Sequence, residues 1–301
     1  MKSELALVER IRRRAGRPRR LSLAIGDDCA IYTPAAGEEL LFTTDMLIED
    51  AHFRRGTHKA ADVGYKTLAR GLSDIAAMGG APRFCLVSLA LAEWTDERWV
   101  DGFYTGLLEL ARATGTELAG GDLARADKVM ADIVVCGSAP AGTALRRGGA
   151  KPGDGIYVTG ALGGSALGLE SRRGMAWRKH LRPEPRLKAG AALREKWGAT
   201  ACMDLSDGLS IDLHRLCAES RVSAELDGDL PVYPGATVAQ ALHGGEDYEL
   251  LFTLPAGVKA PRSIGGALLT RIGSIRRGNA GRIRIEGFEL QPLGYDHFRK
   301  P

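Results

Sequence analysis

Three short acidic segments between residues 26 and 74 constrain this chain more than any other feature. They read Gly26-Asp27-Asp28, Thr43-Thr44-Asp45 and Ser73-Asp74. Each carboxylate follows or ends an apolar run, and none has a basic residue directly beside it. A buried carboxylate is costly unless it is paired or binds a metal. We therefore expect these segments to form an oxygen-ligand site for Mg²⁺, with a phosphate group bridging it.

Three further aspartates follow the same pattern later in the chain. Asp122 follows two glycines at the predicted end of a strand, and Asp204 and Asp207 flank Leu205-Ser206. A single aspartate of this kind is more often a cap or a surface residue, so the prediction rests on the whole set. If the fold gathers these carboxylates, their repulsion requires cations. Mg²⁺ ions with a triphosphate between them meet that requirement, and phosphoryl transfer then needs alignment and charge neutralisation but no protein nucleophile.

Composition restricts the class of protein. With 301 residues, two domains are the default expectation, although one large domain would also fit. The net charge of +4 is too weak to indicate a nucleic-acid partner. Five cysteines without a C-x-x-C pair favour free thiols in a reducing compartment. There is no run of about 18 apolar residues to span a membrane, and the N-terminus lacks the apolar core of a signal peptide. We expect a cytoplasmic protein.

Hydrophobic periodicity and turn residues predict alternating helices and strands. Helices are expected at residues 3–14, 60–78, 96–114 and 209–217, with another after the glycines at 160–168. Strands are expected at residues 21–25 (continued by 30–32), 40–44, 84–91, 118–122, 129–138, 155–159, 201–205, 225–230, 250–254, 268–275 and 282–285. A basic, glycine-rich connection places the domain boundary near residues 145–150, which gives domains of residues 1–147 and 148–301.

Several polar features leave two interpretations open. The arginines between residues 10 and 20 form a solvated face or contact an anionic ligand. No aromatic residue interleaves with them, so base stacking is not expected. His52 is a core or surface histidine, or it binds the phosphate acceptor. Arg147 is a solvated linker residue or binds triphosphate, since guanidinium suits phosphate bidentately. The glycines from Gly160 to Gly168 resemble a phosphate-binding turn, but the G-x-x-x-x-G-K-[ST] pattern is absent.

The motifs resemble those of the thiamine-monophosphate kinase family, within the superfamily of aminoimidazole-ribonucleotide synthetase. The matching segments are collinear and span nearly the whole chain: residues 26–30, 43–47, 52–53, 72–79, 120–122, 149–154, 204–208, 244–250 and 294–298. The sequence Gly-Gly-Glu-Asp-Tyr-Glu at residues 244–249 and the Gly-Tyr-Asp-His-Phe tail separate this family from its superfamily relatives.

The resemblance implies an α/β (α+β) fold of two domains, like that of aminoimidazole-ribonucleotide synthetase. It implies an N-terminal α/β domain that forms a β-barrel shared across a homodimer, a C-terminal α/β sandwich domain, and an active site in a cleft between domains. The implied reaction converts ATP and thiamine monophosphate to ADP and thiamine diphosphate by direct in-line transfer of the γ-phosphoryl group. It serves thiamine diphosphate biosynthesis, and no nucleic acid or membrane is implied as a partner.

The resemblance also implies three sets of site residues, none of them a protein nucleophile. Mg²⁺ would be held by Asp28, Thr43, Thr44, Asp45, Asp74, Asp122, Asp204 and Asp207. ATP would be contacted by Tyr104, Gly121, Asp122, Arg147 and Ser206. Thiamine monophosphate would be contacted by His52, Glu246 and Tyr295, and Asp27 would support the metal shell.

Two positions depart from the family pattern. Leu123-Ala124 stand where the family often has two threonines, so a hydroxyl contact from those positions is absent. Asp50 stands where members usually carry glycine, and this bears on the placing of His52.

Three other functions are alternatives. One is another enzyme of the superfamily, acting on aminoimidazole precursors or selenide. Selenide chemistry would need a reactive cysteine before the acidic stretch, and residues 1–25 contain none. A non-catalytic thiamine-phosphate or nucleotide binding protein would have lost several metal carboxylates, which are all present. A nucleic-acid-binding protein using the arginine run would show steep salt dependence.

Overall fold

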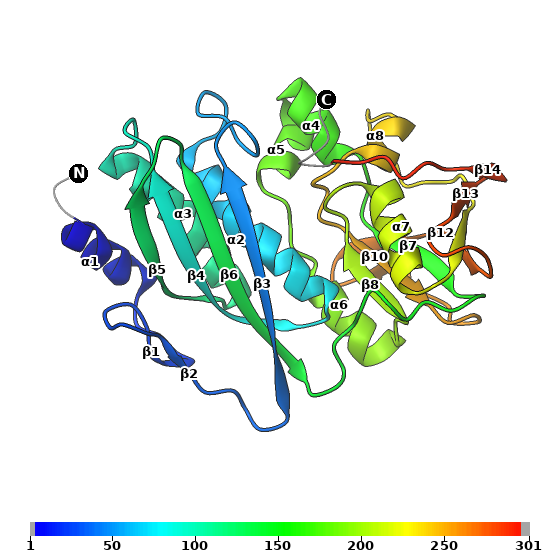
Figure 1. Cartoon of the computed structure of the whole chain (residues 1–301), viewed down its shortest axis with the longest axis horizontal. Helices are drawn as coiled ribbons and strands as arrows, with labels where there is room; N and C mark the ends of the chain where they lie inside the picture. Colours follow the sequence, from blue (N-terminus) through cyan, green and yellow to red (C-terminus); the bar gives the residue numbers. More distant parts are fainter. Residues whose placement is uncertain (1–3, 296–301) are drawn as a thin grey trace. The chain divides into compact units, whose positions relative to one another are not determined.

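The structure is a computed structural model that describes residues 4–295 (Figure 1). Its contacts divide the described chain into two units. Unit 1 comprises residues 4–75 and 81–142, and unit 2 comprises residues 76–80 and 143–295. Both units mix helices and sheets, as the α/β expectation requires.

Unit 1 is built on a four-stranded sheet. Its elements are α1 (Glu4–Ala15), β1 (Leu21–Leu23), β2 (Ile31–Tyr32), β3 (Glu38–Ile48), α2 (Ala60–Ala77), β4 (Ala81–Leu91), α3 (Glu97–Thr114), β5 (Glu117–Arg125) and β6 (Met130–Pro140). The strand order is β3-β6-β4-β5; β6 runs antiparallel to both its neighbours, and β4 and β5 are parallel.

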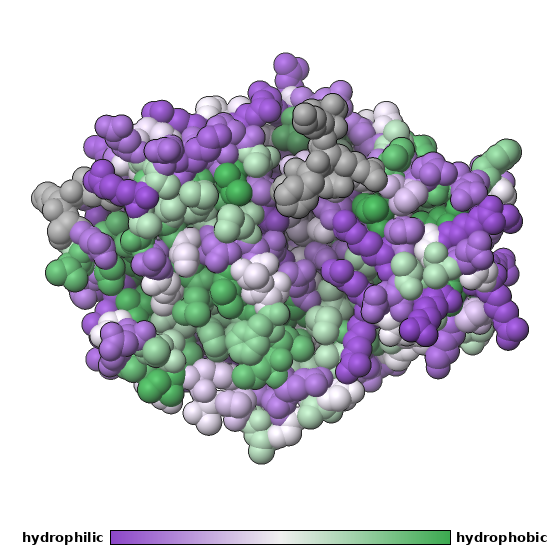
Figure 2. All heavy atoms as spheres, in the orientation of Figure 1, coloured by the Kyte–Doolittle hydropathy of each residue, from purple (hydrophilic) through white to green (hydrophobic). Residues whose placement is uncertain are grey.

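The two faces of this sheet differ because side chains alternate along each strand. Val87, Ile133 and Val135 are buried on one face. There α2 packs so closely that a Cβ added at Gly71 would lie 2.5 Å from the side chain of Val135. On the other face, Phe42 is 64% exposed, and Figure 2 shows apolar residues gathered over part of this sheet. One face is therefore the core of unit 1, and the other presents apolar side chains.

Strand β3 corrects one expectation from the sequence. We expected a strand over residues 40–44 with Asp45 at its end. Instead β3 pairs with β6 along its whole length, and Asp45 lies opposite Ile133 inside the strand. The alternation of exposed and covered residues continues through Met46 and Leu47, so nothing ends the strand at the aspartate. Asp122 is likewise internal to β5, opposite Ser88 of β4.

Helix α1 accounts for part of the arginine run. Arg10 pairs with Glu97 at 3.0 Å and Asp101 at 3.1 Å, and Arg14 also reaches Asp101 at 3.1 Å. These contacts attach α1 to α3 through charges that are partly solvated, which favours the solvated-face interpretation over an anion site. Residues 30–32 do not continue the first strand, because β2 turns back and pairs antiparallel with β1.

Unit 2 contains an eight-stranded sheet with short helices. Its elements are β7 (Gly155–Thr159), α4 (Gly164–Ser171), α5 (Gly174–Leu181), α6 (Leu187–Ala192), the π-helix η1 (Leu193–Trp197), β8 (Ala201–Asp204), α7 (Leu209–Glu219), β9 (Ser223–Leu226), α8 (Val238–His243), β10 (Leu250–Leu254), β11 (Ser263–Ile264), β12 (Ala267–Arg276), β13 (Ile283–Ile285) and β14 (Phe288–Glu289). The strand order is β14-β13-β9-β12-β7-β10-β8, with β11 beside β12.

Strand β10 shows how this sheet is covered. All five of its residues are buried, and its four apolar residues divide between two apolar clusters. Leu251 packs with Leu213 and Leu216 of α7, whereas Phe252 packs with Leu193 of η1. The continuous apolar run of β10 therefore reflects a central strand covered on both faces. Helices α5, α6, η1 and α8 were not expected, because each is too short to show a clear helical period.

None of the helices among residues 4–295 has the length and apolar character needed to cross a membrane.

Two glycines set the distance between α2 and α3. A Cβ at Gly64 would lie 1.9 Å from the carbonyl oxygen of Phe103, and one at Gly106 would lie 1.7 Å from that of Ala61. The two helix backbones therefore touch, and neither position has room for a methyl group.

We expect Gly106→Ala to lower the free energy of unfolding by about 2–3 kcal/mol, because overpacking forces the helix backbones apart. Urea unfolding followed by circular dichroism measures this. Gly56→Ala is the matched control, because its Cβ would meet no atom within 4 Å. Equal stability of the two variants would contradict the close helix contact.

Candidate functional site

An acidic cluster lies where α2 crosses β3. Asp45 points to the helix-covered side of the sheet, and Arg70 of α2 donates to its Oδ1 at 2.8 Å. Thr43, on the same side, donates a short hydrogen bond to the carboxylate of Asp74. The structure thus brings together three predicted metal ligands, Thr43, Asp45 and Asp74, on two elements of unit 1.

Thr44 lies on the opposite side of β3. Its hydroxyl donates to Oδ1 of Asp132, on β6, at 3.0 Å. Thr43 and Thr44 cannot face the same point in an extended strand, because successive side chains point to opposite faces. The predicted pair of threonine ligands is therefore split, and Asp132 is an acidic neighbour that the sequence prediction missed.

Electrostatics single out Asp45 in this cluster. Burial, as the largest cause, and the charges of Asp74 and Asp132 raise the pKa of its carboxyl, the charge of Arg70 lowers it, and the resulting pKa is about 6. Desolvation and like charges both disfavour the ionised form. A divalent cation would offset both effects.

A second group of predicted residues lines a hollow in unit 1. This hollow, of about 1040 Å³, is lined by four predicted site residues, Asp28, Tyr104, Gly121 and Asp122, and also by Asp27. Residues of α1, including Val8 and Ile11, line it as well. Tyr104 is 4% exposed, and burial raises the pKa of its hydroxyl. Residues from four separate segments therefore converge on a space large enough for a nucleotide.

The fold itself requires glycine at position 121, whether or not a ligand binds there. A Cβ at this position would lie 1.9 Å from the carbonyl oxygen of Val87 on β4. We expected the Gly120-Gly121 pair to let a phosphate approach the backbone. The close approach that the structure contains is instead that of the neighbouring strand, next to a register shift between Cys85 and Leu86.

Only one of the five cysteines is exposed. Cys29 lines the same hollow beside Asp28, whereas Cys85, Cys136, Cys202 and Cys217 are buried, and all five are free thiols. Burial raises the pKa of Cys136 to about 11 and that of Cys85 and Cys217 to about 12.

His52 is held by a tight turn after β3. The backbone N–H of Ile48 donates to Nδ1 of His52 at 3.1 Å, so a neutral ring carries its proton on Nε2. Asp50 has a φ of 69°, in the left-handed region that favours glycine, and it pairs with Lys128 at 2.9 Å. Glycine suits this position because the backbone is in the left-handed region, and Asp50 adopts that left-handed conformation here.

In unit 2, the loop Ser206–Gly208 is organised by Asp212. Its Oδ2 accepts the backbone N–H groups of Ser206, Asp207 and Gly208 at 3.1, 3.0 and 3.1 Å. Burial raises the pKa of Asp212 to about 6, although these amides and Arg215 lower it. Arg215 also contacts the carboxylate of Asp207. Asp212 thus fixes the backbone of Ser206, a predicted ATP contact, and of Asp207, a predicted metal ligand. Asp204 lies buried at the end of β8.

Both predicted substrate contacts of unit 2 meet this loop through their backbones. The N–H of Glu246 donates to Ser206 O at 2.7 Å, and that of Tyr295 donates to Asp207 O at 3.1 Å. The Glu246 carboxylate lies 3.4 Å from Nδ1 of the buried His180. The rest of the tail motif, residues 296–298, lies outside the described residues.

Arg147 lies apart from these residues in unit 2. Its carbonyl oxygen accepts a hydrogen bond at 3.0 Å from Ser220, at the C-terminal end of α7. The loop with Ser206 and Asp207 precedes the other end of this 11-residue helix, roughly 16 Å away at 1.5 Å per residue. Within unit 2, therefore, Arg147 is not gathered with Ser206.

The glycine-rich turn before α4 binds a carboxylate of the same chain, that of Asp247. Asp247 accepts the N–H groups of Gly163 at 2.6 Å and Ser165 at 3.0 Å. These are the amides that a phosphate at the helix N-terminus would use. The resemblance to a phosphate-binding turn is therefore explained by an internal cap.

Glu249, two residues further on, accepts hydrogen bonds from three side chains of unit 2. Lys179 binds it at 2.8 Å, Arg186 at 2.7 Å and 2.8 Å, and Thr159 at 2.7 Å. Burial alone would raise the pKa of Glu249, but these donors hold it below its usual value. Within the Gly-Gly-Glu-Asp-Tyr-Glu motif, Asp247 and Glu249 therefore stabilise the fold.

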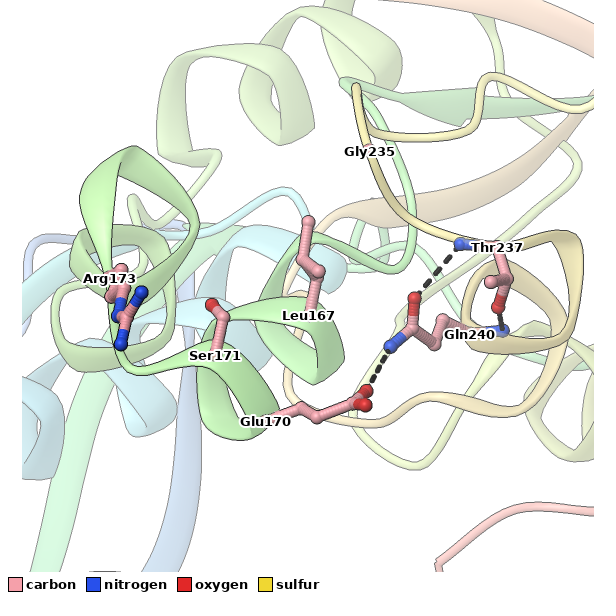
Figure 3. A pocket seen from close by; sticks show the side chains of 7 residues that line it. All are labelled: Leu167, Glu170, Ser171, Arg173, Gly235, Thr237 and Gln240. Atoms are coloured by element: carbon pink, nitrogen blue, oxygen red, sulfur yellow. Dashed lines mark hydrogen bonds between the residues drawn. The ribbon is translucent and has the colours of Figure 1, made fainter.

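Two further hollows are lined by none of the predicted site residues. Figure 3 shows one of about 490 Å³ between α4 and the segment leading into α8, where Gln240 binds Glu170 at 2.8 Å and joins a capping box with Thr237. Three of its polar residues, Glu170, Thr237 and Gln240, are hydrogen-bonded to one another. A third hollow, of about 400 Å³, is basic and is lined in part by Arg276, Arg277, Arg282 and Arg284.

The sequence prediction missed Arg70, Asp132, Asp212 and Arg215. The i, i+3 spacing of Asp212 and Arg215 on a predicted helix was an available signal. The polar Asp132 in an alternating apolar strand was another. Nothing in the sequence pairs Arg70 with Asp45.

The donor chemistry of the acidic cluster fits Mg²⁺. The side chains of Thr43, Asp45 and Asp74 offer oxygen atoms and no sulfur or nitrogen, which is the donor set that Mg²⁺ prefers. Within residues 4–295, no group of three or more His, Cys, Asp or Glu side chains is arranged to hold a metal ion, so the threonine hydroxyl and the phosphates of a nucleotide would have to complete the proposed site. Arg70 and Thr43 hold the carboxylates of Asp45 and Asp74 in the structure.

Comparison with protein families matches both parts of the chain. Residues 26–139 match the N-terminal domain of AIR synthase related proteins, and residues 151–269 match the C-terminal domain of the same proteins.

Individual relatives extend this match over most of the chain. Thiamine-monophosphate kinase of Escherichia coli strain K12 is 38% identical over 93% of both chains. The crystal structure of thiamine-monophosphate kinase from Stenotrophomonas maltophilia K279a has a TM-score of 0.82 and 36% identity, covering 96% of this chain and 98% of its own. A structure described as AaThiL complexed with AMPPCP and TMP has a TM-score of 0.79 and 31% identity, covering 98% of this chain and 97% of its own. The chain belongs to the thiamine-monophosphate kinase family.

Proposed function

We propose that this chain transfers the γ-phosphoryl group of ATP to thiamine monophosphate, giving thiamine diphosphate and ADP. Family membership over both domains supports the reaction. The structural observation that supports this reaction is the grouping of Asp45, Asp74 and Thr43 where α2 crosses β3. The related AaThiL protein was solved with AMPPCP and TMP, which supports ATP and thiamine monophosphate as the two substrates.

Mg²⁺ is the proposed cofactor, and the chain supplies its oxygen ligands. We assign Thr43, Asp45 and Asp74 to one part of the metal site, and Thr44, on the opposite face of β3, to another part. Asp28 and Asp122, which line the hollow of unit 1, are further proposed ligands, and Asp204 and Asp207 are the proposed ligands of unit 2. Bound Mg²⁺ would neutralise phosphate charge, so that transfer needs alignment rather than a protein nucleophile.

The substrates are assigned to the remaining residues. The hollow in unit 1 is the proposed nucleotide site, with Tyr104, Gly121 and Asp122 in its wall. Ser206 and Arg147 are the proposed ATP contacts of the C-terminal domain. His52, Glu246 and Tyr295 are assigned to thiamine monophosphate. The working domain division is residues 1–147, for ATP, Mg²⁺ and dimerisation, and 148–301, which completes the site.

We further propose a cytoplasmic homodimer. Five free cysteines support a reducing compartment. The uncovered face of the unit 1 sheet, which carries Phe42 at 64% exposure and Met46 at 46%, supports association through this sheet.

The reaction is tested directly with purified protein, ATP, Mg²⁺ and thiamine monophosphate. We expect ADP and thiamine diphosphate in equal amounts, and chelation of Mg²⁺ should stop both. With ATP labelled in the γ-phosphate, the label should appear in thiamine diphosphate and never on the protein. Absence of ADP formation would refute the proposed activity, and a labelled phosphoprotein would refute direct transfer.

Asp45→Asn and Asp74→Asn should each lower kcat at least about 100-fold, because each removes one charge that holds the cation. Steady-state rates over a range of Mg²⁺ concentrations measure this. Asp127→Asn is the control, because Asp127 is an exposed residue between β5 and β6. Near-wild-type turnover in either site variant would contradict its metal role.

Phe42→Glu should convert the dimer to a monomer, because it places a charge in the apolar face. Light scattering coupled to size exclusion gives the mass. Phe288→Glu is a matched control in unit 2, where Phe288 is 78% exposed. A Phe42→Glu protein that remains dimeric would place the interface elsewhere.

A further inference from the structure

Arg70 binds one of the proposed metal ligands, Asp45, and lies one helical turn before another, Asp74. It belongs to α2, four residues before Asp74, so the two side chains lie on the same face of the helix. Its Nη2 donates to Asp45 Oδ1 at 2.8 Å, and its Nη1 donates to the carbonyl oxygen of Met46 at 3.0 Å. The guanidinium group is thus anchored to the backbone of β3 as well as to the carboxylate.

The ion pair is largely shielded from solvent. The side chain of Arg70 is 13% exposed and that of Asp45 is 21% exposed. Charge pairs at this depth are screened far less than surface pairs. The charges of Asp74 and Asp132 repel that of Asp45, and the charge of Arg70 attracts it. The positive charge of Arg70 therefore lies at an oxygen of Asp45 that the proposed cation would use.

We propose that Arg70 neutralises Asp45 in the metal-free protein through their ion pair, and that a divalent cation must displace Arg70 in order to bind Asp45. The inference rests on the proposed function in one respect, because it takes Asp45 as a metal ligand. It assigns Arg70 as a positioning residue that acts through Asp45. As a consequence, the nucleotide-free protein binds divalent cations weakly, and the negative phosphates of a nucleotide favour the exchange of Arg70 for metal.

The charge of Arg70 has two separable effects on a cation. The guanidinium group repels the cation directly, and it uses the carboxylate oxygen that the cation needs. Both effects weaken metal binding, so removing the charge should strengthen it. A role limited to holding β3 and α2 together predicts the opposite, because losing such a contact loosens the ligands.

The experiment measures Mn²⁺ binding to nucleotide-free protein, with Mn²⁺ as the probe in place of Mg²⁺. The electron paramagnetic resonance signal of free aqueous Mn²⁺ reports the unbound ion during titration. Arg70→Met should bind Mn²⁺ roughly 10- to 100-fold more tightly than wild type, the size expected for removing one nearby unit charge. Arg70→Lys keeps the charge and should stay closer to wild type.

Arg83→Met is the matched control. Arg83 pairs with Glu38 on the same strand β3, and its side chain is 20% exposed. Glu38 lies seven residues from Asp45 along the strand, which is roughly 23 Å at 3.3 Å per residue. The control removes a similarly shielded arginine charge, carried by β4 and paired with β3 outside the acidic cluster, and its Mn²⁺ affinity should equal that of wild type.

Unchanged or weaker Mn²⁺ binding in Arg70→Met would overturn the inference, as would an equal gain in Arg83→Met. Thermal unfolding checks that each variant is folded, and Arg70→Gln, which retains hydrogen-bonding groups, replaces Arg70→Met if the latter does not fold. Turnover of thiamine monophosphate by the wild-type protein is measured separately. Failure of the proposed function therefore appears in that assay, and failure of this inference appears in the Mn²⁺ affinities.

Discussion

A carboxylate removed from water must find a donor or a positive charge, and this requirement shapes both units of the protein. Asp212 satisfies it with three backbone amides, Asp247 with two, and Glu249 with a lysine and an arginine. These partners belong to the chain and hold the loop before α7, the N-terminus of α4 and the end of β7 in place. Acidic residues that look alike in the sequence are therefore structural in these three positions.

The acidic cluster of unit 1 meets the same requirement with side chains of α2 and β3. Asp45 is paired with Arg70, while burial, and after it the charges of Asp74 and Asp132, raise the pKa of its carboxyl to about 6. Asp74 is held by the hydroxyl of Thr43, a donor that a cation can replace. The three structural carboxylates thus fix loops and helix ends of unit 2, whereas these two proposed metal ligands lie where α2 crosses β3.

The sequence predicted the architecture better than the geometry of the site. The long periodic helices over 60–77 and 97–114 and the apolar strands of both units were foreseen, because their patterns are local. The position of Asp45 inside β3 was not foreseen, since it depends on pairing with β6, about 90 residues later in the chain. The contact between Arg70 and Asp45 depends on the same tertiary packing. The close approach of the backbone at Gly121 was expected for a phosphate, and the structure shows in addition that Val87 of the neighbouring strand requires it.

The distribution of thiols has a practical consequence. Four cysteines lie in the core, and burial keeps them protonated well above neutral pH, whereas Cys29 is exposed in the wall of the unit 1 hollow. A thiol-specific fluorophore therefore labels the folded protein at this one position without any engineered cysteine. The dye then reports, through its emission, when the space beside Asp28 fills or empties. The native chain thus provides its own optical probe of ligand entry.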